Sequence, residues 1–177
     1  EKIAWCMTGS GHLLEESVEL LEKASASGKF KVVLFLSSAS EEILKIYGLW
    51  ARVEKIGLKT IREKEQGKSF PAVGAMYGHG YSMLVIAPAT ANTVAKIRLG
   101  IGDSLVSGLA DQAQKNRIPA LIMPCDIAPE QEEILPDGKK VKIYPSEIGL
   151  ENLANLRKRK FIEIVESMAE LEERLLG

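Results

Sequence analysis

The sequence predicts an α/β protein in which a doubly wound parallel sheet lies between two layers of helices, as a three-layer sandwich. Two observations indicate this class. Short apolar runs alternate along the chain with longer amphipathic stretches, which is typical of strands followed by crossover helices. The segment Lys31–Leu36 contains a continuous apolar run, as expected for a strand that is covered on both faces and lies near the centre of its sheet.

The first half of the chain contains three predicted strands, at residues 3–7, Lys31–Leu36 and Lys59–Arg62. The helix after the first strand has an apolar face made of Leu13, Leu14, Val18, Leu20 and Leu21. Ser40 precedes two glutamates and is predicted to be the N-cap of a second helix. Apart from the strand at 59–62, we interpret residues 52–80 as a long functional loop, because they contain many glycines and little regular pattern.

The second half continues the alternation. A buried strand at 83–87 is expected to stop at Pro88, which has no N–H to donate. Helices are expected at 90–99 and 104–115, a strand at 121–123, an edge strand at 141–144 and an amphipathic closing helix at 161–176. Neither a linker nor an internal repeat divides the chain, so residues 1–177 are expected to form one domain.

Composition excludes several function classes. The chain has 23 Lys and Arg against 24 Asp and Glu, a formal net charge of −1, whereas a general nucleic-acid binder needs a basic excess. Two cysteines are too few for a disulfide framework, and we expect no metal site. The apolar runs are far shorter than the roughly 18 residues that span a bilayer. With no signal peptide visible, we expect a cytoplasmic protein without nucleic-acid or membrane partners.

Small and hydroxylated residues follow the first two strands. Gly9 and Gly11 allow a tight turn into a helix, whose backbone N–H groups and positive dipole end then favour an anion, and Ser10 adds a hydroxyl. Ser37 and Ser38 follow the second strand, where a dinucleotide site would have an acidic residue. The pattern therefore favours the phosphate of a mononucleotide such as FMN over NAD. The alternative is that the glycines and Ser10 only turn the chain and cap the helix.

A second candidate segment follows the strand at 83–87. Pro88 ends the strand, small residues at Ala89 and Ala91 let a flat ligand approach the backbone, and Asn92 offers both a donor and an acceptor to a polar ring edge. The isoalloxazine ring of a flavin has this character. The alternative is that Asn92 is an ordinary helix cap.

At these residues the sequence resembles the homo-oligomeric flavin-containing cysteine decarboxylase superfamily. The resemblance is carried by Thr8-Gly9-Ser10, by Ser37 and above all by the block from Ala87 to Ile97 with Gly100-Ile101-Gly102-Asp103-Ser104-Leu105 after it. It implies a flavodoxin-like, or Rossmann-like, sheet with FMN at a subunit interface, in a trimer or a dodecamer. The cofactor-binding residues that we predict are Thr8, Gly9, Ser10, Ser37, Ser38, Pro88, Ala89, Thr90, Ala91, Asn92, Thr93, Cys125 and Asp126.

Within that superfamily the sequence is more similar to archaeoflavoproteins and dihydromethanopterin reductases. Glu63-Lys64-Glu65-Gln66-Gly67, Ser69-Phe70-Pro71 and Met123-Pro124-Cys125-Asp126 carry this likeness. The last motif lacks the Asn of the decarboxylases. The likeness implies either electron transfer from a ferredoxin or reduction of a pterin. An FMN-dependent decarboxylase and a non-catalytic flavin-binding protein are the alternatives.

Several single residues remain open. His79 and Tyr77 are candidate catalytic residues that would approach the flavin from a neighbouring subunit, or else lie on an exposed loop. Helix packing is expected of His12, a core position of Cys6, and flavin contact without nucleophilic chemistry of Cys125. The four basic residues at 157–160 form a solvated face or a docking site for an acidic electron donor.

Overall fold

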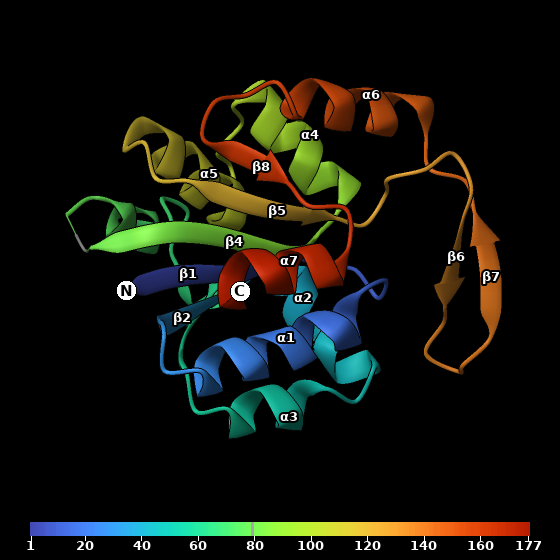
Figure 1. Ribbon diagram of the computed structural model, residues 1–177, viewed down its shortest axis with the longest axis horizontal. Coiled ribbons are helices and arrows are strands. Elements are labelled where there is room, and N and C mark those ends of the chain that lie inside the picture. The colour runs from blue at the N-terminus through green and yellow to red at the C-terminus, as the bar shows by residue number, and fades with distance from the viewer. Residues whose placement is uncertain (79) are drawn as a thin grey trace.

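Six parallel strands form the central sheet of the computed structural model, which describes residues 1–78 and 80–177 (Figure 1). Their order is β3-β2-β1-β4-β5-β8. The strands are β1 (Lys2–Met7), β2 (Lys31–Leu36), β3 (Lys59–Arg62), β4 (Tyr81–Ala89), β5 (Ala120–Pro124) and β8 (Ile162–Ile164). The predicted doubly wound parallel sheet is confirmed, and its strand order is that of the Rossmann pattern.

The direction of winding reverses between β1 and β4. From β1 the chain passes to β2 and β3 on one side, and it then returns to place β4 on the other side of β1. In open α/β sheets, ligands bind beyond the carboxyl ends of the strands at such a switch point. The segments that follow β1 and β4 therefore flank the crevice in which a ligand is expected.

Helices cover both faces of the sheet. One face carries α1 (Leu14–Ala26), α2 (Ser38–Ile46), α3 (Trp50–Lys55) and α7 (Met168–Leu176), and the other carries α4 (Ala91–Leu99), α5 (Leu105–Lys115) and α6 (Glu147–Leu156) (Figure 1). Successive side chains of β1 alternate between the two cores: Trp5 packs with α1, whereas Cys6 packs with α5. Cys6 is fully buried, as expected, and burial raises the pKa of its thiol. The three layers are thus confirmed.

The end of one strand and the start of one helix differ from the prediction. Pro88 does not end β4, which continues to Ala89, because the Pro88 carbonyl accepts the N–H of Thr8 at 3.2 Å and the Ala89 carbonyl accepts that of Cys125 at 2.9 Å. The predicted closing helix at 161–176 was wrong in its first part. Residues 162–164 form β8 beside β5, and α7 begins only after Ser167, whose Oγ accepts the N–H of Glu170 at 3.1 Å.

A two-stranded antiparallel hairpin extends from the carboxyl side of the sheet (Figure 1). It consists of β6 (Gln131–Ile134) and β7 (Lys140–Ile143). The predicted strand at 141–144 is therefore an element of this separate hairpin and not an edge of the main sheet. The sequence did not predict β6, α6 or α3, the last of which extends into the predicted loop at 52–80, because the pattern of charged and apolar residues in these segments matches no single period well.

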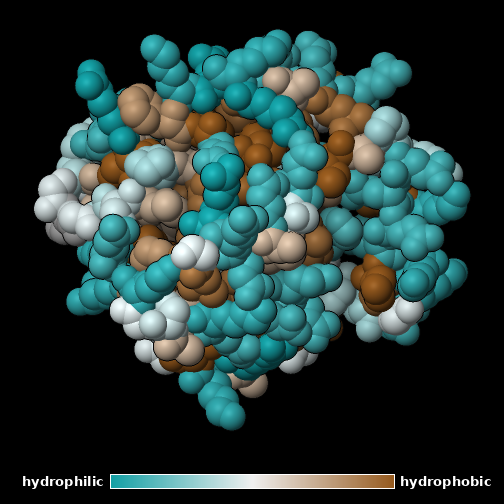
Figure 2. Space-filling model, viewed as in Figure 1, coloured by the Kyte–Doolittle hydropathy of each residue, from teal (hydrophilic) through white to brown (hydrophobic). Residues whose placement is uncertain are grey.

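The face in view is mostly hydrophilic (Figure 2). Apolar side chains gather in its upper half, over the region of α4 to α6, and at one point of the hairpin. Exposed large apolar residues include Leu99, Ile101 and Ile148 on the α4–α6 side, and Ile134 on the hairpin. Among the residues that the structure describes, there is no helix long and apolar enough to cross a membrane.

Candidate flavin-binding site

Thr8 ties the two strands of the switch point together. Its Oγ1 donates to the Pro88 carbonyl at 2.8 Å and accepts the backbone N–H of Thr90 at 2.9 Å. The side chain is buried, with 2% of the residue exposed. The Thr8 hydroxyl is therefore used inside the protein, and the contribution of Thr8 is to hold the 8–12 loop against the 88–93 segment.

The two glycines of the 8–12 loop are required by packing. A Cβ on Gly9 would lie 2.5 Å from the Cβ of Ala39, and a Cβ on Gly11 would overlap the ring and hydroxyl of Tyr47. Ala39 and Tyr47 lie at the beginning and the end of α2. At Gly9 the loop thus lies at a distance from α2 that only glycine allows, whereas a side chain at Gly11 would require the Tyr47 ring to move.

The same loop presents backbone N–H groups that the rest of the described chain does not use. The N–H groups of Gly9, Gly11 and His12 make no hydrogen bond with the described residues, whereas Ser10 N–H donates to the Thr8 carbonyl at 2.9 Å. Leu13, the N-cap of α1, has φ 61° and no capping side chain. A non-glycine residue in this left-handed region is strained, and such strain is often found at functional sites. The loop therefore has the free donors that an anion needs.

The start of α2 differs in one detail from the prediction. Ser37 is the N-cap in place of Ser40: its Oγ accepts the N–H of Ser40 at 3.0 Å. Ser40 is buried and donates its hydroxyl to the Ser37 carbonyl at 2.8 Å. Because the Ser37 hydroxyl is only accepting, its proton is available for a ligand. The Ser38 N–H donates to Glu63 at 3.4 Å.

The 88–93 segment has a buried half and an exposed half. Thr90 is the N-cap of α4, since its Oγ1 accepts the N–H of Thr93 at 3.3 Å, so Asn92 is not the cap. Ala89 and Thr93 are buried and shape the backbone. Ala91 is half-buried and Asn92 is exposed, without a hydrogen bond to the described residues. These two residues are left to face a ligand.

The end of β5 joins the same crevice. Cys125 Sγ lies 4.0 Å from the His12 carbonyl, and burial raises the pKa of the Cys125 thiol to about 12. This thiol is therefore neutral. Burial also raises the pKa of the Asp126 carboxyl, and the nearby His12 opposes that shift. His12, for which we expected helix packing, ends the 8–12 loop near Asp126 and lines the neighbouring cavity, and its place next to the glycines was the sequence signal for this.

A cavity of about 490 Å³ adjoins the 8–12 loop on the hairpin side. Gln131 anchors the hairpin there, because its Nε2 donates to the Cys125 carbonyl at 2.7 Å. The Tyr47 hydroxyl donates to the Ile134 carbonyl at 3.3 Å and closes the other side. Walls come from the start of α1, from α2 and its following loop, and from the hairpin: Gly11, His12, Leu13, Glu15, Glu16, Tyr47, Leu49, Glu132, Ile134, Leu135, Pro136, Gly138 and Lys140.

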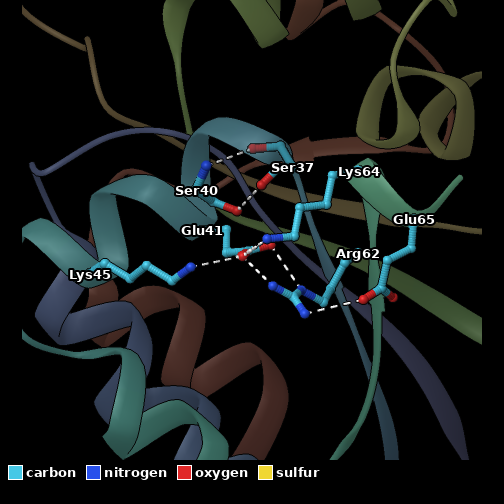
Figure 3. A network of polar contacts seen from close by, with 7 residues as sticks. All are labelled: Ser37, Ser40, Glu41, Lys45, Arg62, Lys64 and Glu65. Atoms are coloured by element: carbon cyan, nitrogen blue, oxygen red, sulfur yellow. Dashed lines mark hydrogen bonds and ion pairs between the residues drawn. The ribbon is translucent and has the colours of Figure 1, made fainter.

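An ion cluster around the buried Glu41 supports α2 (Figure 3). The Glu41 side chain is 4% exposed and pairs with Lys45 at 3.0 Å and with Arg62 and Lys64. The hydrogen bond from Arg62 is the main reason that the pKa of the Glu41 carboxyl falls to about 2. Lys45 and Arg62 also lie over the Trp50 ring. The cluster joins the end of β3 to α2, and so fixes the helix that presents Ser37.

Two features predicted to take part in function, Tyr77 and the basic run at 157–160, lie away from the crevice. Tyr77 is 51% exposed, follows the 3₁₀ segment η2 (Pro71–Met76) and precedes β4, close to Lys115 at the end of α5. This is the edge at which the strands begin, opposite to the crevice. The basic run at 157–160 precedes β8 and lies on the same edge. His79 lies outside the described residues.

The sequence profile of the Flavoprotein family matches residues 1–174. The chain belongs to this family. Two members are called dihydromethanopterin reductase (acceptor). The one from Methanosarcina mazei is 41% identical over 133 residues, which cover 72% of this chain and 56% of that protein. The one from Methanocaldococcus jannaschii is 36% identical over 175 residues, covering 93% of this chain and 71% of the relative.

Solved structures of other proteins agree with the fold. Burkholderia xenovorans DmrB in complex with FMN, described as a cubic protein cage for redox transfer, has a TM-score of 0.86 and 36% sequence identity, covering 98% of this chain and 92% of that one. A dodecameric FMN-dependent Ubix-like decarboxylase from Escherichia coli O157:H7 has a TM-score of 0.72 at 16% identity, covering 99% of this chain and 90% of that one. At that identity the second likeness concerns the fold alone.

Proposed function

We propose that this chain binds FMN in the switch-point crevice and uses it to reduce a pterin. The observation that carries the proposal is the meeting of three predicted groups at one edge of the sheet: the unpaired amides of the 8–12 loop, the Ser37 hydroxyl, and the half-buried Ala91 with the exposed Asn92. Similarity to DmrB with FMN supports the cofactor. Similarity to two dihydromethanopterin reductases supports the substrate class.

The residues of the crevice fit FMN. The amides of Gly9, Gly11 and His12, with the Ser37 hydroxyl, would hold the phosphate dianion through neutral donors, whereas the Ser10 hydroxyl donates to the His12 carbonyl at 3.2 Å within the loop. Ala91 and Asn92 would lie along the ring. Bound FMN supplies two-electron redox chemistry, and the protein supplies position and surroundings. The Cys125 thiol is neutral at physiological pH, so it brings no charge to the ring.

Further parts of the proposal concern the partners. The cavity of about 490 Å³ beside the 8–12 loop is within the usual range for a small-molecule site and would admit a compact heterocyclic acceptor.

We also propose a homo-oligomer, a trimer or a dodecamer, with FMN at the subunit interface. The cage of the DmrB relative supports this assembly, and the exposed Leu99 and Ile101 at the end of α4 offer apolar surface for a subunit contact on the amino edge. A ferredoxin is the proposed electron donor.

The test is reconstitution with FMN followed by turnover. Bound oxidised flavin should give an absorption band near about 450 nm. Mixed anaerobically with reduced ferredoxin or NADPH and dihydromethanopterin, the loaded protein should form the tetrahydro product, and the Ser10→Asp chain should not. Carbon dioxide released from a peptidyl or pantothenoyl cysteine would instead show a decarboxylase. Bound FMN without turnover in either assay would show a flavin-binding protein without this activity. Light scattering measures the subunit number.

A further inference from the structure

One carboxylate joins the starts of two helices that are distant in the sequence. Glu63 Oε2 accepts the N–H of Leu105 at 2.9 Å, and Glu63 Oε1 accepts the N–H of Ser38 at 3.4 Å. Leu105 is the first residue of α5, and Ser38 is the first residue of α2. Both helices therefore direct their positive dipole ends at the same negative charge.

Glu63 serves the amides that the helix caps leave unpaired. Ser37 caps α2 through the N–H of Ser40, and Ser104 caps α5 through the N–H of Ser107 at 3.3 Å. In each helix the cap reaches the third residue, and the N–H of the first residue still needs an acceptor. Glu63 provides that acceptor for both helices.

The position of Glu63 is fixed from both sides. Its neighbours Arg62 and Lys64 both pair with the buried Glu41 of α2 (Figure 3). Three residues after Glu63, Gln66 Oε1 accepts the N–H of Ala72 at 3.0 Å. Because the backbone is held in this way, little conformational freedom remains to be lost when the carboxylate bridges the helices. The motif Glu63-Lys64-Glu65-Gln66 thus connects β3 to α2, α5 and η2.

We infer that Glu63 is a positioning residue for the flavin phosphate. The inference rests on the proposed function, in which Ser37 is a phosphate contact. By fixing the first residue of α2 against α5, Glu63 sets the direction of the Ser37 hydroxyl. Because Glu63 already occupies the Ser38 N–H, the phosphate is directed to Ser37 and to the amides of the 8–12 loop, and Ser38 itself is left out of the phosphate contacts.

The experiment compares two flavins that differ only in the phosphate. Fluorescence titration gives the Kd of FMN and of riboflavin for the wild type, for Glu63→Gln and for the control Glu65→Gln, whose carboxylate pairs at the surface with Arg62 alone among the described residues. An amide offers one acceptor oxygen and cannot serve both helices equally. In Glu63→Gln the Kd of FMN should rise about tenfold or more, the effect of losing one charge-assisted hydrogen bond. The Kd of riboflavin should change by less than about twofold.

Each outcome decides the inference. An equal rise for both flavins would show a general loss of structure, a lower Kd for FMN would show that Glu63 repels the phosphate, and an unchanged Kd for both flavins would show no role; all three overturn it. If Glu63→Gln does not fold, Glu63→Asp is measured by the same criteria, because its carboxylate is one methylene too short to reach both helices. A wild type that does not bind FMN contradicts the proposed function itself, whereas an unchanged ratio contradicts only the role of Glu63.

Discussion

The two edges of the central sheet carry different chemistry. At the carboxyl edge, Ser10, Ser37 and Asn92 are neutral, and the 8–12 loop presents backbone amides that pair with no described residue. At the amino edge, residues 157–160 are all basic, and they are engaged with neighbours at the surface: Arg157 pairs with Glu166 at 2.6 Å, and Arg159 donates to the Arg98 carbonyl at 3.2 Å. The difference teaches that backbone donors at strand ends make a better candidate for a specific anion site than a conspicuous cluster of charge.

The largest effect is expected at the carboxyl edge. Ser10→Asp would place a negative charge beside the flavin phosphate, and at a partly buried site like charges about 4 Å apart repel by roughly 4 kcal/mol. The Kd of FMN should therefore rise by at least about a hundredfold. The matched control is Ser27→Asp, at the end of α1 on the amino edge, which should leave FMN affinity unchanged. Equal FMN affinity in both variants would refute the placement of the phosphate.

The close approach of the 8–12 loop to α2 gives the second prediction. Gly11→Ala would drive a methyl group into Tyr47, and such overpacking costs about 1–3 kcal/mol of unfolding free energy. Gly67→Ala is the control, because a Cβ there meets no atom within 4 Å. Urea denaturation of the two variants measures the difference. If Gly11→Ala were as stable as Gly67→Ala, the loop would not depend on glycine.

The ion cluster behind α2 predicts a pH dependence. The folded-state pKa of Glu41 is about 2, below its ordinary value of 4.5, so the ionised carboxylate stabilises the fold above that ordinary value. This contribution is lost as the pH falls from about 4.5 towards 2. Glu41→Gln should lower the unfolding free energy at pH 7 by about 2 kcal/mol, as expected for lost charged hydrogen bonds.

The Glu41→Gln variant also tests the pH range over which the Glu41 carboxylate stabilises the fold. Over the same acidic range the unfolding free energy of Glu41→Gln should decline less than that of the wild type, as measured by denaturant melts at a series of pH values. Glu65→Gln, at an exposed pair of the same cluster, should change the unfolding free energy by less than about 1 kcal/mol. Parallel pH curves for the wild type and Glu41→Gln would contradict the assignment.

The smallest effect is expected at the amino edge. Lys158→Gln combined with Lys160→Gln removes two exposed positive charges from the basic run. Because this run lies at the opposite edge from the crevice, the rate of FMN reduction by reduced ferredoxin should stay within about twofold of the wild type. Anaerobic stopped-flow at low salt measures the rate. A large decrease in this rate would instead indicate that the basic run at 157–160 is the docking site of the electron donor.

Much of the fold was predictable because it depends on local patterns. The strands at Lys31–Leu36 and Lys59–Arg62 have the predicted bounds, and Thr90 and Ser104 begin α4 and α5 as N-caps. The segment at 161–176 was not predictable in the same way. Ile162–Ile164 is a strand because β5 offers it a partner, and a partner from elsewhere in the chain leaves no local signal.

The candidate site was likewise predictable in part from local sequence and in part only from tertiary contacts. Sequence alone determined which residues are small, hydroxylated or free of charge at the strand ends, and the order of strands and helices then brought them to one edge. Only the tertiary structure decided how each is used: that Thr8 is internal, that Ser37 is the cap, and that Glu63 joins α2 to α5. The physical reason is that composition and periodicity act over a few residues, whereas a hydrogen bond between distant segments exists only once packing has fixed both partners.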